Sequence, residues 1–187
     1  IRRMWELLPT NTPSRSRLYN FAMLNSFELL GLISPDLSNR ILTDTAEDNR
    51  EVYDATLTSV AKLRRMRPQF LKRQPKPARH KLVIESLKRP AFEETATQLL
   101  SGWLIKHQVE MLKQFLNALK IDHEDGVVEN LPPEVPDDDL NAAIDILLSS
   151  HDREIVILYL HAFHSMNDVG WSNLEALLEN DHRVQFM

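Results

Sequence analysis

The chain has 187 residues, of which 43% are hydrophobic and 26% charged, the composition of an ordinary globular protein. The absence of cysteine excludes disulfides, Cys-ligated zinc, iron–sulfur clusters and thiol catalysis, and the net charge of −5 indicates no particular partner. No apolar run approaches the roughly 20 residues that span a bilayer, and no secretory signal is visible. We therefore expect a cytoplasmic protein without membrane contact.

Helix signals begin early in the chain. Thr12 is a good N-cap and Pro13 a good first helical residue, because proline lacks the N–H that would be unpaired there. Apolar residues at helical spacing follow, and Gly31 and Pro35 are expected to end this helix. A weaker helix is expected over residues 38–46.

The next helix has stronger signals. Asp48 or Asn49 can cap it, its apolar residues recur at near-heptad spacing, and Pro68 is expected to stop it. Residues 68–77 contain three prolines and allow at most one helical turn. A further helix is expected over residues 78–89.

The central stretch, residues 90–121, carries two apolar stripes that point in opposite directions. Advancing about 100° per residue places the second stripe roughly opposite the first, with Gly102 at the changeover. We therefore expect either one long helix buried on two faces or a bend between Gly102 and His107, with the two halves contacting different helices. Trp103 should be buried. The two stripes are Phe92, Ala96, Leu99 and Trp103, and then Ile105, Val109, Leu112, Leu116 and Leu119.

The last third of the chain predicts three more helices. A polar turn over residues 122–126 and a proline-rich, extended connection over residues 127–136 come first. The expected helices are one capped by Asp137 or Asp138, one over residues 155–166 that starts at Ser150 or Asp152 and is apolar nearly all round, and one over residues 173–179 capped by Ser172. The tail, residues 181–187, is expected to be loose or a docking strand.

These elements predict an all-α fold: a single-domain multihelical bundle of about eight helices around a long or bent central helix. We interpret residues 1–187 as one helical domain. The proline-rich connection at 127–136 is a candidate boundary between two subregions. No convincing strand pattern and no fixed-period repeat is present.

Common enzyme motifs are missing. The four glycines, at positions 31, 102, 126 and 170, lie too far apart for a phosphate-binding loop or a dinucleotide fingerprint. There is no Gly-x-Ser-x-Gly elbow and no His-Glu-x-x-His pair. Residues 122–126 resemble a calcium loop superficially, but Ile121 stands where an EF-hand requires an acid. The sequence therefore favours a protein that is not an enzyme and has no cofactor.

The best metal candidate is the set His161, His164 and Asp168. Their i, i+3, i+7 spacing places two imidazoles and a carboxylate on one helical face, a combination that binds zinc or a similar ion. The alternative is that this is simply the more polar side of the helix, opposite its apolar stripe. Two histidines on the more polar side of a helix are more common than a metal site.

A second candidate is the pair His151–Asp152, a weak resemblance to all-α phosphohydrolases that bind metal through a His-Asp pair. Such a site needs further ligands, for which His123 and Asp181 can be nominated. Helix capping alone explains Asp152 and is the interpretation that we favour.

Charge asymmetry is the feature that stands out most. Residues 62–89 hold eleven of the 22 basic residues and one acid, whereas residues 121–187 hold 15 of the 27 acids and two bases. The basic block could contact phosphates, although Phe70 is its only aromatic residue. The alternative is that the two blocks complement each other within one fold. The candidate binding residues are Arg64, Arg65, Arg67, Lys72 and Arg73.

The sequence thus supports three functions in descending order. The first is a non-enzymatic helical protein-interaction or structural domain, whose partner is another protein or a second copy. The second is a nucleic-acid-binding protein that uses residues 62–89. The third is a metal-dependent enzyme.

Overall fold

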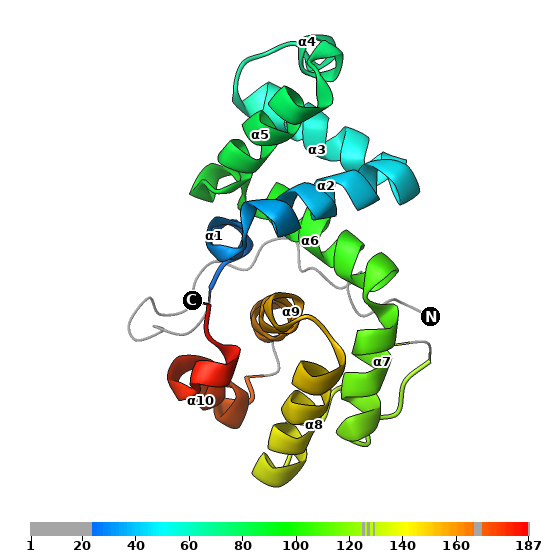
Figure 1. Ribbon diagram of the computed structural model, residues 1–187, viewed down its shortest axis with the longest axis vertical. Helices are drawn as coiled ribbons and strands as arrows, with labels where there is room; N and C mark the ends of the chain where they lie inside the picture. The colour runs from blue at the N-terminus through cyan, green and yellow to red at the C-terminus, as the bar shows by residue number, and fades with distance from the viewer. Residues whose placement is uncertain (1–23, 125, 127, 129, 167–169, 187) are drawn as a thin grey trace. The chain divides into compact units, whose positions relative to one another are not determined.

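The computed structural model describes residues 24–124, 126, 128, 130–166 and 170–186. These residues form ten α-helices and two short 3-10 helices and contain no β-strand, so the predicted all-α class is confirmed (Figure 1). The expected helix start at Thr12 and Pro13 lies outside the described residues. There are two more helices than predicted over the described part, because residues 68–73 form a helix and the central stretch forms two.

The structure divides into two compact units, one formed by Asn25–His107 and one that contains the chain from Gln108 onward. We call them the amino-terminal unit and the carboxy-terminal unit. The division lies at residues 107–108, and the proline-rich segment 127–136 lies inside the carboxy-terminal unit. Each unit has its own buried apolar residues, which is what an independent hydrophobic core requires.

In the amino-terminal unit, helix α6 is the common packing partner. It contacts α1, α2, α3 and α5. Leucines at its centre, Leu99 and Leu100, are at most 1% exposed, as are Ile41 of α2 and Val60 of α3. The elements are α1 (Ser26–Leu32), α2 (Pro35–Asp48), α3 (Arg50–Leu63), α4 (Pro68–Arg73), α5 (Lys76–Leu87), η1 (Pro90–Phe92) and α6 (Glu93–His107).

Several helix starts in this unit involve proline. Pro35 begins α2 rather than ending the helix before it, and the Ser34 hydroxyl accepts a hydrogen bond from Leu37 N at 3.1 Å. Pro77 likewise lies in the first turn of α5. The predicted starts at residues 38 and 78 were too late because proline is tolerated in a first turn, where no N–H is needed. The predicted cap Asn49 is confirmed at the start of α3.

The central stretch breaks close to where its two apolar stripes change phase. Helix α6 ends at His107, and α7 (Val109–Ala118) begins after Gln108. Helix α6 packs within the amino-terminal unit and α7 packs on α8, so the two halves contact different helices as predicted. Gly102 lies inside α6 and is not the break. Trp103 is buried as predicted, at 1% exposed, and its Nε1 donates to the Asp44 carboxylate at 3.0 Å.

The carboxy-terminal unit is built around α9. Its residues 155–164 are all buried, which confirms the prediction from their nearly uniform apolar character. Helix α9 contacts α8, α10 and η2. Two aromatic rings of α9 contact rings from other segments. The ring centroids of Tyr159 and Phe115 of α7 lie 5.5 Å apart, and those of Phe163 and Trp171, which precedes α10, lie 5.4 Å apart. The elements after α7 are α8 (Asp137–Ser150), α9 (Arg153–Met166), α10 (Ser172–Asn180) and η2 (His182–Val184).

The described part of the tail is folded rather than loose. Arg153 donates to the carbonyl oxygens of His182 at 2.9 Å, Arg183 at 3.2 Å and Gln185 at 3.0 Å. Val184 is completely buried. The prediction of a loose tail or a docking strand is therefore wrong for residues 181–186. The guanidinium group, with its five donors in a fixed fork, is suited to holding several carbonyls at once.

Candidate interaction surface

The turn that follows α3 has an unusual residue at its sharpest point. Arg65 N donates to Lys62 O at 3.1 Å and Met66 N donates to Ala61 O at 2.8 Å, the hydrogen-bond pair of a Schellman motif. Arg65 has a φ of 56°, in the left-handed region where glycine is usual. The chain reverses here and enters α4, whose first residue is Pro68. Arginine therefore occupies a position at which most side chains are strained by about 1–2 kcal/mol.

This turn and α4 carry an exposed group of side chains that we call the basic tip: Leu63, Arg65, Arg67, Phe70 and Arg73. Leu63 is 51% exposed and Phe70 is 55% exposed. The three arginines are exposed and make no side-chain hydrogen bond or ion pair with any described residue. Two large apolar side chains and three arginines without a partner among the described residues thus lie exposed within residues 63–73.

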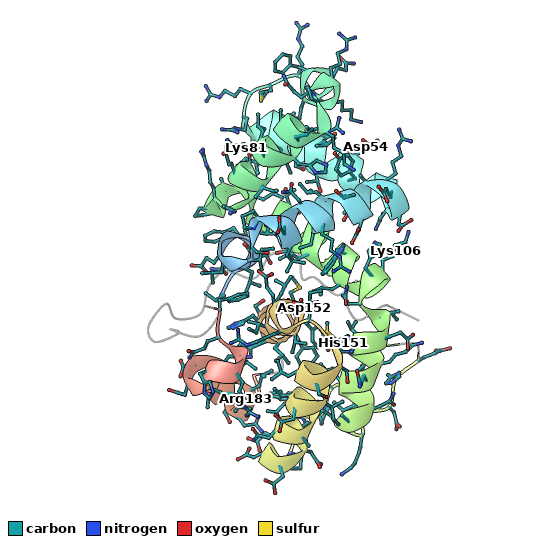
Figure 2. All side chains as sticks on the ribbon, in the orientation of Figure 1. Asp54, Lys81, Lys106, His151, Asp152 and Arg183 are labelled. Atoms are coloured by element: carbon teal, nitrogen blue, oxygen red, sulfur yellow. The ribbon has the colours of Figure 1, made fainter. Side chains whose placement is uncertain are left out.

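The other two predicted binding residues are used inside the unit. Arg64 is half-buried, and its guanidinium donates to the Ser86 hydroxyl on α5 at 3.3 Å. Lys72 forms an ion pair with Asp54 on α3 at 2.8 Å. Figure 2 labels Asp54 and, on α5, the exposed Lys81. The structure therefore leaves three of the five predicted basic residues, Arg65, Arg67 and Arg73, available to a partner.

Arg79 of α5 fixes the end of α4. Its guanidinium donates to Lys72 O at 2.8 Å, to Gln74 O at 3.4 Å and to the Tyr53 hydroxyl at 3.0 Å. The Tyr53 hydroxyl in turn lies 3.2 Å from His80 Nε2. Burial, together with the nearby basic side chains, lowers the pKa of His80 to about 4. Neutral His80 can therefore accept from Tyr53, and the whole chain of hydrogen bonds holds α4 in place.

The predicted metal residues are only partly brought together. His161 and His164 both lie in α9 and are buried, each with one ring nitrogen that has no hydrogen-bond partner among the described residues. Burial lowers the pKa of both, to about 4 for His161, so both are neutral near pH 7. Asp168 lies outside the described residues. Among the described residues no group of three or more His, Asp or Glu side chains could hold a metal ion.

The His-Asp pair has structural partners. His151 Nε2 lies 2.7 Å from Gln114 Oε1, and His123 Nε2 lies 3.2 Å from Asn117 Oδ1. The Asp152 carboxylate accepts a backbone N–H from the first turn of α9 at 2.9 Å, which is the capping role that we favoured. These contacts account for the pair without a metal.

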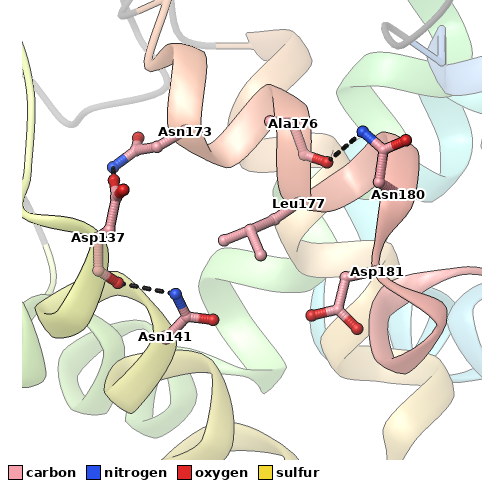
Figure 3. Close-up of a pocket in the computed structure, with 7 residues that line it drawn as sticks. All are labelled: Asp137, Asn141, Asn173, Ala176, Leu177, Asn180 and Asp181. Atoms are coloured by element: carbon pink, nitrogen blue, oxygen red, sulfur yellow. Dashed lines mark hydrogen bonds between the residues drawn. The ribbon is translucent and has the colours of Figure 1, made fainter.

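The carboxy-terminal unit contains a groove between α8 and α10 that the sequence analysis did not identify (Figure 3). Its volume is about 480 Å³. Each amide nitrogen in its wall already donates: Asn173 to the Asp137 carboxylate, Asn141 to Asp137 O and Asn180 to Ala176 O, each at 2.9 Å. The groove is lined by Asp137, Asn141, Asn173, Ala176, Leu177, Asn180 and Asp181. The available signal was the i, i+7 spacing of Asn173 and Asn180 on one helical face.

One guanidinium group is already bound at the edge of this groove. Arg183 Nε donates to the Asp181 carboxylate at 2.8 Å, and its terminal nitrogens donate to Asn141 Oδ1 at 3.0 Å and to the carboxylate of Asp145. The hydrogen bonds from Arg183 lower the pKa of Asp181. Two groove residues, Asn141 and Asp181, thus serve as acceptors for a guanidinium.

Comparisons of the chain with protein-family models, with curated proteins and with solved structures give no match. None of the helices in the described part of the chain combines the length and apolar character that crossing a bilayer requires.

Proposed function

We propose that the protein is a non-enzymatic protein-interaction domain and that the basic tip is its contact surface. The observation that carries the proposal is the exposure of Leu63 and Phe70 among three arginines that have no partner in the described structure. Aromatic residues and arginine are enriched at protein interfaces and dominate their binding energy. The strained backbone at Arg65 adds support, since strain is often retained at sites that serve function.

A protein partner is favoured over nucleic acid for two reasons. Phe70 is the only aromatic side chain in residues 62–89, so successive bases would have no stacking platform. Lys72 and Arg64 are occupied within the unit, which leaves three arginines of the predicted set for phosphate contacts. Nucleic acid remains the second candidate, because exposed arginines attract any polyanion.

The test is a titration of the protein with a labelled peptide of alternating glutamate and leucine, and separately with labelled duplex and single-stranded oligonucleotides, each at low and high salt. We expect the peptide to bind more tightly than either oligonucleotide, because it satisfies both the arginines and the apolar side chains. Phe70→Ala should weaken peptide binding by on the order of 1–2 kcal/mol. Tight oligonucleotide binding that Phe70→Ala does not change would favour the second candidate instead.

A charge-matched control is available in the same block. Arg65→Glu, Arg67→Glu and Arg73→Glu together remove the cations of the basic tip. Lys81→Glu, Lys88→Glu and Arg89→Glu change the net charge equally, and those three residues are also exposed. We expect the first triple variant to lose peptide binding and the second to keep most of it. Equal losses in both variants would show that only net charge matters and would contradict a defined surface.

A further inference from the structure

Residues 108–187 hold a surplus of negative charge that the cations among them do not neutralise. Residues 108–187 contain 16 Asp and Glu but only four Lys and Arg. All four of these bases already interact within the described part of the unit. Lys113 pairs with Glu110, Lys120 pairs with Asp139, Arg153 donates to backbone carbonyls, and Arg183 donates to Asp145 and Asp181.

The α8–α10 groove is the place on this unit whose chemistry fits a further cation. Asp137 and Asn180 line it on opposite sides of the apolar Leu177 (Figure 3). The Asn180 Oδ1 atom accepts no hydrogen bond from the described residues. Asn141 and Asp181 already bind the guanidinium of Arg183. Carboxylate and amide oxygens on either side of an apolar side chain can accept hydrogen bonds from an arginine while the apolar side chain packs against a neighbouring apolar residue of the partner.

We propose that the basic tip of one copy of this chain docks into the α8–α10 groove of a second copy. The inference rests on the proposed function and names the partner of that same surface. Charge complementarity supports this contact: residues 25–107 contain 14 Lys and Arg against ten Asp and Glu, the reverse of the balance in residues 108–187. The tip supplies guanidinium groups with Leu63 and Phe70, and the groove supplies acceptors with Leu177.

Such a contact joins two different patches, so it is heterologous. Every copy carries one tip and one groove, and association continues past the dimer unless a ring closes. Because exposed arginines and carboxylates provide much of the attraction, the contact weakens as salt rises.

The experiment measures the weight-average mass of the full chain by sedimentation across a concentration series at low and high salt. We expect the mass at low salt to rise with concentration beyond that of a dimer or to level off at a ring, and to fall to the monomer value at high salt. A mass that stays monomeric at low salt overturns the inference. A salt-dependent change in frictional ratio at constant mass also overturns it, because the tip would then be engaged within its own chain.

Two charge-reversed variants identify the surfaces. The tip variant carries Arg65→Glu, Arg67→Glu and Arg73→Glu. The groove variant carries Glu134→Lys, Asp138→Lys and Glu179→Lys; these exposed acids lie within three positions of a groove residue in sequence, and their carboxylates have no partner among the described residues. Each variant alone should be monomeric, since its tip and groove carry like charges. An equimolar mixture should associate, because each protein then offers the surface that the other lacks.

Circular dichroism of each variant checks that it is folded. If either variant alone still associates, or if the mixture does not associate although circular dichroism shows both variants folded, the inference is overturned. The single variant Phe70→Ala changes no charge and should weaken wild-type association by on the order of tenfold. An absence of self-association is distinct from failure of the proposed function. A monomeric protein whose tip still binds the acidic peptide retains that function with another partner.

Discussion

Replacing Arg65 with glycine should stabilise the protein while removing part of its proposed contact surface. Arg65 has a φ of 56°, and in this left-handed region a non-glycine residue costs about 1–2 kcal/mol. Glycine relieves this strain but adds about 0.5–1 kcal/mol of conformational entropy loss on folding. The side chain has no partner among the described residues, so no contact is lost. The net expectation is a gain of about 0.5–1 kcal/mol in the free energy of unfolding.

The assay is urea denaturation followed by circular dichroism, together with titration by the acidic peptide. Lys120 is the matched control, because it has a φ of 58° in the same motif at the end of α7 but pairs with Asp139 at 3.2 Å. Lys120→Gly should give a smaller gain in stability, since an ion pair is lost, and should leave peptide binding unchanged. A clear loss of stability for Arg65→Gly would refute the strain argument. Unchanged peptide binding would refute the role of Arg65 in the contact.

The remaining predictions concern the two cores and the support of the tip. Trp103→Ala should lower the free energy of unfolding by about 3–5 kcal/mol, because it opens a cavity and removes the hydrogen bond to Asp44; a denaturation curve shifted by less than about 1 kcal/mol would contradict this. Buried His80 and His161 have pKa values lowered from 6.5 to about 4, so the unfolded chain binds protons below pH 6.5 that the folded chain does not. The free energy of unfolding should therefore fall as the pH is lowered from 6.5 to 4, by about 3 kcal/mol per histidine. A free energy of unfolding that does not change over this range would contradict the lowered pKa of these histidines. Arg79→Leu should weaken peptide binding although Arg79 is not a residue of the basic tip, because the carbonyls at the end of α4 lose their hydrogen-bond donor. Full peptide binding at unchanged helicity would show that α4 does not need these hydrogen bonds.

Much of the fold followed from local sequence signals. The all-α class and the cap at Asn49 depend on helical periodicity and on side-chain capping, which act over one or two turns. The division of the central stretch was predictable because the two stripes place apolar residues on opposite faces, and one straight helix in one layer cannot bury both. Its position was less predictable: the bend was expected between Gly102 and His107, and the break falls at Gln108, directly after that range.

The details that escaped prediction depend on contacts between distant residues. Nothing near Lys72 in sequence indicates that it pairs with Asp54. Likewise, nothing near Arg64 indicates that its guanidinium donates to the Ser86 hydroxyl of α5. The tail is ordered by Arg153, about thirty positions earlier in the chain. The α8–α10 groove likewise exists only once two helices are placed side by side. The sequence left open whether the basic block faces solvent or the acidic block, and which of its arginines lack a partner among the described residues required the structure.

Hydrogen–deuterium exchange of the full chain with and without the acidic peptide measures whether the basic tip is a contact surface, at low salt and at a protein concentration at which sedimentation gives the monomer mass. We expect slower exchange of backbone amides in residues 64–73 when the peptide is bound, with little change in the buried helix α9. We also expect Arg65→Glu, Arg67→Glu and Arg73→Glu together to abolish this protection. Protection centred elsewhere in the amino-terminal unit, or no protection at peptide concentrations that saturate binding, would contradict the claim.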